Sequence, residues 1–199
     1  MKHILFNPFE KYPDRVLIPF GLFFSVVGVI FGYIFNARYD GIIDLHFVEK
    51  VNIYQPIFEI CVNIFCASIS LFVFGKLINN KTRLIDLISV FMLARAPLYL
   101  LTVFNINGTM FKFSSEILGL IDLKTNSNPN VSTLLSESLV IIFIFSIFVL
   151  VFTVWFFALL WNGFKVATNA KGNKAVVFFV IAIILSEILS KIIIYSTNL

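Results

Sequence analysis

Charged residues are scarce in this chain of 199 residues. They make up 13% of it, whereas about 25% is usual in soluble domains. Hydrophobic residues reach 59%, an excess that a soluble core cannot absorb, and no stretch is long and polar enough to form a separate water-soluble domain. The composition therefore excludes an ordinary soluble protein and favours a single membrane domain over residues 1–199.

Residues that carry enzyme chemistry are also few. The two histidines, His3 and His46, are expected on opposite sides of the membrane, so they cannot share a metal ion or a proton relay. Cys61 and Cys66 lie on different sides of one apolar helix and are interpreted as packing residues. No H-E-x-x-H, G-x-S-x-G or phosphate-binding glycine motif occurs. We therefore predict no catalytic residue, no cofactor-binding site and no metal site, and expect that the protein is not an enzyme.

Basic residues are spread along the chain in small groups. They give a formal net charge of +4, but they never form a basic face with interleaved aromatic residues, which is typical of nucleic-acid-binding proteins. We therefore expect no nucleic acid among the partners. The basic residues are interpreted instead as markers of orientation in a membrane.

Long apolar runs divide the chain, and each is long enough to cross a bilayer as a helix. The runs lack the alternating pattern of barrel strands, and hydrocarbon offers no hydrogen bonds to backbone groups, so helices are strongly preferred. We predict an all-α, polytopic helical membrane protein. Its five transmembrane helices are expected at Val16–Phe35, Pro56–Phe74, Leu84–Val103, Ser138–Leu160 and Ala175–Tyr195.

The basic groups alternate with the apolar runs. Nine lysine and arginine residues precede the first run or lie in the second and fourth loops: Lys2, Lys11, Arg15, Lys76, Lys81, Arg83, Lys165, Lys171 and Lys174. The first and third loops carry far fewer. Because cytoplasmic loops carry the excess of lysine and arginine, we expect the N-terminus in the cytoplasm and the C-terminus outside.

One substantial segment lies outside the predicted spans, the outer loop 104–137. Residues Phe111–Leu123 in this loop are rich in apolar side chains, and the turn-forming residues Lys124–Asn130 follow them. This pattern predicts a short helix at the membrane interface and then a turn.

Charged residues fall inside three of the apolar runs: Glu59, Asp86, Arg95, Glu187 and Lys191. A charge in hydrocarbon costs at least a few kcal/mol unless it is paired. At 1.5 Å per residue, Arg95 and Glu187 lie roughly 17–18 Å from the inner boundary, and Glu59 and Lys191 lie about 5 Å below the outer one. We predict ion pairs Arg95–Glu187 and Glu59–Lys191. Because Glu187 and Lys191 are one helical turn apart, these four residues are expected to form a single charge ladder.

Two residues in the third run carry local predictions. Asp86 falls in the first turn, where a helix N-terminus favours a carboxylate, and a structural capping role at the membrane surface is expected. Pro97 lacks a backbone N–H and predicts a kink in mid-span, two residues beyond Arg95. A charge beside a kink is either part of a substrate path or a fixed structural joint, and both interpretations stay open.

Small residues recur at intervals of three and four in the first and fifth runs: Gly21, Ser25, Gly28, Gly32, Ala182, Ser186 and Ser190. This spacing places the small side chains on one stripe of each helix, where another helix can approach closely. Packing within the chain is the preferred interpretation, and a dimer interface is the alternative.

Four stretches carry a resemblance to a known family: Asn7-Pro8 with the polar run up to Arg15, Ala94-Arg95-Ala96-Pro97-Leu98, Trp161-Asn162-Gly163-Phe164-Lys165 and Gly172-Asn173-Lys174-Ala175. In order and spacing they resemble the Yip family, five-span membrane proteins first described as partners of Ypt/Rab GTPases. The resemblance implies a helical membrane bundle with a cytoplasmic N-terminus. Eukaryotic members generally have a long cytosolic N-terminal region, so this chain is more similar to the short bacterial branch, which implies the bacterial inner membrane.

Three functions are compatible with these features. The first hypothesis is a non-enzymatic integral membrane protein that acts as a scaffold or assembly subunit of a membrane complex, in contact with the lipid bilayer and with other membrane proteins or a second copy. The alternative is a transporter or channel-like subunit with a polar path for a small solute at Arg95, Glu187 and Lys191. The third is a lipid-handling or membrane-shaping protein that uses Phe111–Leu123.

Overall fold

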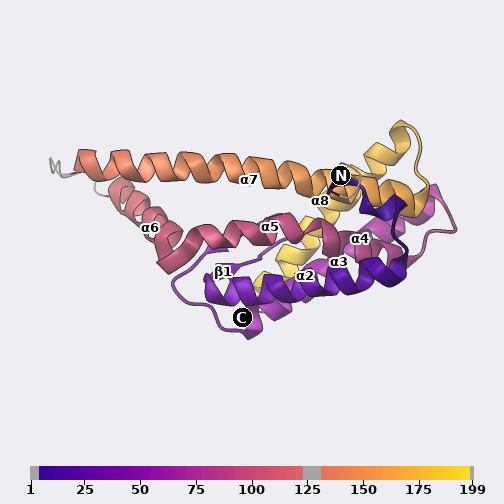
Figure 1. Ribbon diagram of the computed structural model, residues 1–199, viewed down its shortest axis with the longest axis horizontal. Coiled ribbons are helices and arrows are strands. Elements are labelled where there is room, and N and C mark those ends of the chain that lie inside the picture. The colour runs from indigo at the N-terminus through magenta and orange to yellow at the C-terminus, as the bar shows by residue number, and fades with distance from the viewer. Residues whose placement is uncertain (1–4, 123–130, 198–199) are drawn as a thin grey trace.

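The chain folds into a bundle of long helices with one short antiparallel pair of strands (Figure 1). The computed structural model describes residues 5–122 and 131–197, with the backbone alone over 116–122 and 131–139. In chain order the elements are η1 (Pro8–Glu10), α2 (Asp14–Ile34), β1 (Ala37–Arg38), β2 (His46–Phe47), α3 (Tyr54–Ile78), α4 (Leu84–Ala94), α5 (Ala96–Leu100), η2 (Leu101–Gly108), α6 (Thr109–Asp122), α7 (Val131–Thr168) and α8 (Asn173–Ser196).

Five helical segments are long and apolar enough to cross a membrane, which confirms the five predicted helices. Four are α2, α3, α7 and α8, and the fifth runs over Leu84–Ser115 through α4, α5, η2 and the start of α6. The largest difference between a predicted and an observed helix is in α7, which covers Val131–Thr168, whereas Ser138–Leu160 was predicted. Helical hydrogen bonds do not require apolar side chains, so a helix can continue past its apolar run.

Successive long helices run antiparallel, so the basic segments of the chain lie at one end of the bundle, which we call the basic end. There, Arg83 before α4 forms an ion pair with Asp14 at the start of α2. The opposite end, the loop end, holds residues 36–53. At this end the Asn105 side-chain amide donates to the Phe35 carbonyl at 2.7 Å, which joins η2 to the end of α2.

Asp86 lies in the first turn of α4, at the basic end. Its carboxylate accepts hydrogen bonds from the Arg83 guanidinium at 2.7 and 3.0 Å. The N-terminus of α4 also favours this negative charge. Both contacts agree with the predicted structural role for Asp86.

The small-residue stripe of α2 packs against other helices of the same chain. Every member of the stripe is buried: Gly21, Ser25, Gly28 and Gly32. Gly21 lies against Met92 of α4, and Gly28 lies against the ring of Tyr99 in α5. A methyl group added at Gly28 would come within 2.8 Å of that ring. Packing within the chain, the preferred interpretation, is therefore confirmed for this stripe.

The stripe in α8 is also buried within the chain: Ala182, Ser186 and Ser190. The main neighbour of α8 is α3. Ser186 donates to the Ile183 carbonyl at 2.9 Å and Ser190 donates to the Glu187 carbonyl at 3.1 Å. Each hydroxyl is therefore satisfied inside its own helix, and the small side chains leave room for a close neighbour.

The helix of the third span is interrupted next to Pro97, where a kink was predicted, and the interruption lies at Arg95. Helix α4 ends at Ala94 and α5 begins at Ala96, with Pro97 in the first turn of α5. Pro97 has no N–H to continue the α-helical ladder, and the Leu98 N–H instead donates to the Arg95 carbonyl at 3.0 Å. The break places the start of the Arg95 side chain between two helix ends in the middle of the bundle.

The predicted outer loop is largely helical. Helix α6 confirms the short helix predicted at Phe111–Leu123, except for Leu123 itself, which lies outside the described residues, as does the predicted turn Lys124–Asn130. Helix α7 has 38 residues, a length of about 57 Å, while the hydrocarbon layer is about 30 Å thick. With α6, its first half extends beyond the rest of the bundle (Figure 1).

We predict that the α2 stripe is sensitive to volume. Gly28→Leu should lower the free energy of unfolding by about 1–3 kcal/mol, because the new side chain has to displace the Tyr99 ring. Val26→Leu, on the exposed side of the same helix, is the matched control and should change it by less than about 0.5 kcal/mol. Unfolding curves of the purified protein in detergent measure both. Equal effects of the two substitutions would contradict the packing of Gly28 on Tyr99.

Candidate functional site: the inserted loop and its charged partners

The segment that joins α2 to α3 enters the bundle between the helices. We call residues 36–53 the inserted loop. Its strands pair antiparallel, with Ala37 opposite Phe47 and Arg38 opposite His46. Tyr39 and Ile42, between the two strands, have no exposed surface. A loop with buried backbone needs polar partners for its N–H and C=O groups. These partners include Glu59 and Asn63 of α3, Glu187 of α8, and Arg95 between α4 and α5.

Tyr39 is held at three points. Its N–H donates to the Glu59 carboxylate at 2.7 Å, and its carbonyl accepts from the Asn63 amide at 2.8 Å. Glu59 and Asn63 are one turn apart on α3, so a single face of that helix binds both sides of the residue. The Tyr39 hydroxyl reaches α2 and donates to the Gly28 carbonyl at 2.8 Å. These bonds fix the loop against two helices.

Glu59 itself is fully buried and carries an ion pair. One carboxylate oxygen accepts from the Arg38 Nε at 2.6 Å, while the other accepts from the Tyr39 N–H. Arg38 keeps about a fifth of its side chain exposed. A buried carboxylate that accepts charge-assisted bonds on both oxygens is well satisfied. Its partners both come from the inserted loop.

Arg95 contacts the loop from the break between α4 and α5. Its side chain is 1% exposed, and its Nη2 donates to the Gly41 carbonyl at 2.8 Å. The guanidinium carbon lies 5.4 Å from the centre of the Tyr39 ring and 5.9 Å from the centres of the Phe91 and Tyr99 rings. A guanidinium stays charged in proteins. Aromatic faces and a carbonyl oxygen are therefore its immediate environment.

Glu187 lies on the other side of the same loop. Its carboxylate accepts from the Ile43 N–H at 3.1 Å and from Lys191 Nζ at 3.2 Å. A side chain at Gly41 would collide with this carboxylate. Gly41 therefore lies between Arg95 and Glu187, with its carbonyl toward the first and its Cα against the second.

The predicted ion pairs were wrong, although the four charges do gather around one feature. The loop backbone separates Arg95 from Glu187, and Glu59 pairs with Arg38. Lys191 pairs with Asp44 of the loop at 2.9 Å as well as with Glu187. The four residues predicted to form a charge ladder, Arg95, Glu187, Glu59 and Lys191, instead each contact the inserted loop. Only the contact between Glu187 and Lys191 is as predicted.

An Asp–His pair lies at the outer rim of the loop. The His46 Nδ1 donates to Asp40 at 2.7 Å, and the Tyr195 hydroxyl donates to the same carboxylate at 3.5 Å. Burial alone would raise the pKa of Asp40, but His46 and Arg38 together bring that pKa below its usual value. The hydrogen bond to Asp40 in turn raises the pKa of His46. Both shifts favour the charged forms of the pair.

Some polar atoms of this centre have no hydrogen-bond partner within the ranges that the structure describes. The Arg95 Nε and Nη1 atoms are buried without a hydrogen-bond partner among the described residues, as is the Tyr99 hydroxyl. Two cavities, both beside α7, are lined by none of these residues. Within the described part of the chain, no three His, Cys, Asp or Glu side chains lie close enough together to hold a metal ion.

Several residues at the centre of the site were missed from the sequence: Arg38, Tyr39, Asp40, Gly41 and Asp44 of the loop, and Asn63 of α3. A signal was present, because the short segment between the first two runs carries three charged residues within Arg38–Asp44. Their partners are not local, since the Ile43 to Glu187 bond spans 144 residues of chain. Depth in the membrane could suggest that two charged helical residues meet, but it could not predict a loop between them.

Comparison with known proteins gives no match to the chain among protein-family models, characterised proteins or solved structures. The resemblance to the Yip family therefore stays a prediction. Three of the stretches that carry it do lie together: Asn7, Trp161, Asn162, Lys165, Gly172 and Asn173 line one cavity at the basic end.

We predict strong energetic coupling between Arg38 and Glu59. In a double-mutant cycle of Arg38→Leu and Glu59→Leu, the loss of both should be less harmful than the sum of the single losses by about 1–3 kcal/mol, because each single change leaves a charge with a missing partner. The matched control is the cycle of Asp44→Ala and Lys191→Ala, whose side chains are about 40% exposed, and its coupling should stay below about 1 kcal/mol. Denaturant titration in detergent measures both. Equal coupling in the two cycles would contradict the buried pairing.

Proposed function

We propose that the protein is a non-enzymatic subunit of a membrane complex, in which the inserted loop holds the bundle rigid and the first half of α7 binds a partner. The partner is another membrane protein or a second copy of the chain. The proposal rests on the contrast between a bundle core whose charges are bound internally and a long helix that is scarcely covered.

The observation that carries the proposal is the exposure of α7. Only 6% of its most apolar stretch is buried within the chain, compared with 28% for α2, 33% for α8, 44% for α3 and 67% for the third span. Its mean hydropathy over that stretch, 2.9, is the highest of the five. Lipid covers part of any outer helix, but α7 also extends beyond the other helices (Figure 1).

A partner-binding stripe is present where α7 leaves the bundle. Four large apolar side chains at intervals of three and four are exposed: Val140, Phe143, Ile144 and Ile147. Phe143 is 67% exposed. The opposite side of the helix packs inward, where Phe145 meets Phe47 of the inserted loop and Phe104 of η2. The stripe is thus held in place by the same loop that binds the buried charges.

We also propose that the basic end faces the cytoplasm and the loop end faces outward, in a bacterial inner membrane. The positions of Lys76, Lys81 and Lys165 at one end of the bundle support this orientation. A short form of the Yip family is the expected relationship, supported by the shared location of three of the resembling stretches.

The transporter alternative requires water at Arg95 or Glu187. Arg95 is 1% exposed, and neither cavity beside α7 is lined by Arg95 or Glu187. The Glu187 side chain is 21% exposed and contacts the loop backbone and Lys191. These contacts favour the structural joint over the substrate path for the break at Arg95.

The proposal is tested by the oligomeric state of variants of the α7 stripe. We expect the protein, extracted from its own membrane in mild detergent, to elute as a stoichiometric complex by size exclusion with light scattering. Phe143→Ala with Ile147→Ala should reduce the complexed fraction about tenfold or more, because large apolar anchors dominate such contacts. Val180→Ala with Ile184→Ala, on the exposed face of α8, is the matched control and should leave the complex intact.

Two outcomes would contradict the proposal. A monomeric, partnerless protein that moves solute across liposomes would overturn the scaffold proposal and support the transporter. Equal loss of the complex in both double variants would show that α7 is not the interface.

A further inference from the structure

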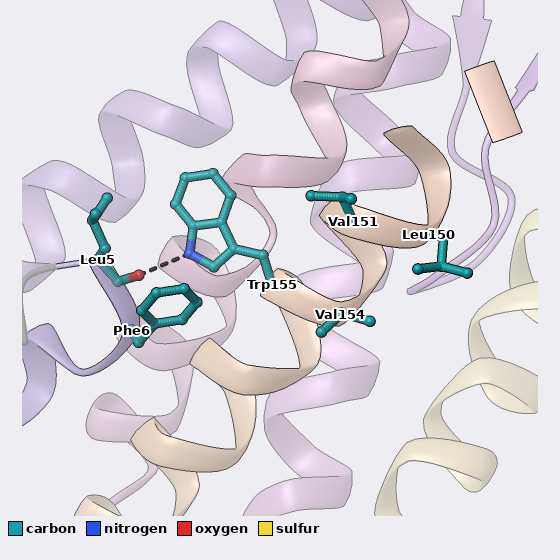
Figure 2. Close-up of a pocket in the computed structure, with 6 residues that line it drawn as sticks. All are labelled: Leu5, Phe6, Leu150, Val151, Val154 and Trp155. Atoms are coloured by element: carbon teal, nitrogen blue, oxygen red, sulfur yellow. Dashed lines mark hydrogen bonds between the residues drawn. The ribbon is translucent and has the colours of Figure 1, made fainter. Parts of the chain in front are cut away.

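Two cavities lie along the second half of α7, away from the stripe proposed for a partner. The first is apolar, has a volume of about 400 Å³ and is lined by Leu5, Phe6, Leu150, Val151, Val154 and Trp155 (Figure 2). The second is mostly polar, has a volume of about 730 Å³ and lies at the basic end between the end of α7 and the start of α8. Neither cavity is used by the function proposed above.

The two cavities share one face of α7. The residues that α7 contributes to them recur at helical spacing: Leu150, Val151, Val154, Trp155, Trp161, Asn162, Lys165 and Val166. Phe156 on the other side of the helix is buried in the core, while Trp155 and Trp161 are partly buried at the border between this face and the core. Ala158, a small residue, lies on this face between the two sets. The first cavity, which we call the apolar groove, and the second, which we call the polar pocket, therefore follow one another along a single face of α7.

The N-terminal segment borders both cavities. The Trp155 Nε1 donates to the Leu5 carbonyl at 2.7 Å, as Figure 2 shows. About two turns further along α7, the Asn162 amide donates to the Phe6 carbonyl at 2.9 Å. Leu5 and Phe6 then line the apolar groove, while Asn7 and Glu10 line the polar pocket. This segment is therefore fixed to α7 at the junction between the two.

The polar pocket contains groups for both signs of charge. Lys165 and Lys171 line it, and so do Gly172 and Asn173, where α8 begins. Gly172 supplies no side-chain cap, so the positive end of the α8 dipole is available to an anion. The carboxylate of Glu10 lines the same pocket. Two ammonium groups, a helix N-terminus and one carboxylate thus line the same pocket.

One polar atom in this pocket lacks a partner. The Asn7 Oδ1 is buried without a hydrogen bond among the described residues. As a carbonyl oxygen it accepts hydrogen bonds, so its complement is a donor such as an ammonium group. Asn7 and Glu10 come from the N-terminal segment, while the lysines come from the α7–α8 connection. Acceptors for a cation and donors for an anion therefore line the pocket from different segments.

The dimensions along α7 fit one lipid molecule. Val151 in the apolar groove and Lys165 in the polar pocket are separated by about 21 Å along the helix axis. One leaflet, with its headgroup region, is about 20–23 Å thick. The polar pocket is at the basic end, and the apolar groove lies toward the middle of the helix, so their order matches the headgroup and acyl chain of a lipid in that leaflet.

We propose that this face of α7 and the N-terminal segment bind a single phospholipid with an ethanolamine headgroup. Its phosphate lies between Lys165 and Lys171 at the start of α8, its primary ammonium is bound by Glu10 and Asn7, and one acyl chain lies against Val151 and Val154. The ethanolamine headgroup satisfies both the lysines and the acceptors, which a purely anionic headgroup does not.

Native mass spectrometry of the delipidated full-length protein tests the proposal. Phosphatidylethanolamine, phosphatidylcholine and phosphatidylglycerol with identical acyl chains are titrated in turn. We expect one tightly bound phosphatidylethanolamine, and Lys165→Gln with Lys171→Gln should weaken it about tenfold or more. Lys76→Gln with Lys81→Gln removes the same charge from the other basic loop and is the matched control. Lys165→Arg with Lys171→Arg should retain binding.

Two further arms separate headgroup from chain. Glu10→Gln should abolish the preference for ethanolamine over glycerol headgroups, because it removes the carboxylate that binds the ammonium. Val154→Trp should fill the apolar groove and weaken lipid binding, while Val180→Trp on the exposed face of α8 should not. Soluble glycerophosphoethanolamine should compete poorly, since it has no acyl chain.

Three results would overturn the proposal. Equal weakening by the two lysine pairs would show that general charge, not the pocket, attracts lipid. Phosphatidylglycerol binding as tightly as phosphatidylethanolamine would exclude the ethanolamine headgroup. Competition by glycerophosphoethanolamine at the concentration of the lipid would exclude the groove and leave a site for a soluble phosphate compound.

Discussion

A fully buried arginine at the break of the third span is the constraint on which the rest of the structure depends. The rings of Tyr39, Phe91 and Tyr99 lie around the Arg95 guanidinium, which donates a hydrogen bond to the carbonyl of Gly41. A charge in such a position is costly without a nearby dipole or counter-charge. The inserted loop supplies the dipole, and it also carries N–H groups to the carboxylates of Glu59 and Glu187. The neutral backbone of the inserted loop therefore lies between Arg95 and Glu187, which would otherwise need to form a direct ion pair.

This arrangement explains why the small residues of α2 matter beyond close packing. The Gly28 carbonyl accepts from the Tyr39 hydroxyl, and its missing side chain leaves space for the Tyr99 ring. Tyr39 and Tyr99 meet edge to face with centres 5.4 Å apart. The loop, the broken third span and α2 therefore share one set of contacts, so each of them supports the position of the other two. Helix α7, whose outer surface is exposed, packs against α4 and α5 of the broken third span.

The sequence predicts the parts of the fold that follow from local pattern. Apolar runs locate the five helices, Pro97 locates the break, and small residues at intervals of three and four locate the buried stripes, because each property repeats along one segment. The sequence does not predict the partners of Arg95 and Glu59. Depth arithmetic compares positions along helices, whereas their partners, Gly41 and Arg38, lie in a loop whose path depends on contacts with α3 and α8. The full length of α7 is missed for a related reason, since a helix can extend past its apolar residues.

Hydrogen exchange of the inserted loop tests the central claim most directly. The amides of Tyr39 and Ile43 donate to Glu59 and Glu187 inside the bundle, so mass spectrometry of the folded protein in detergent should find residues 37–44 protected as strongly as the middle of α3. Glu49 and Lys50, exposed residues of the same connection, serve as the internal reference and should exchange much faster. Exchange of residues 37–44 at the rate of Glu49 and Lys50 would contradict the account, because the loop would then lie in water and Arg95 would need another partner.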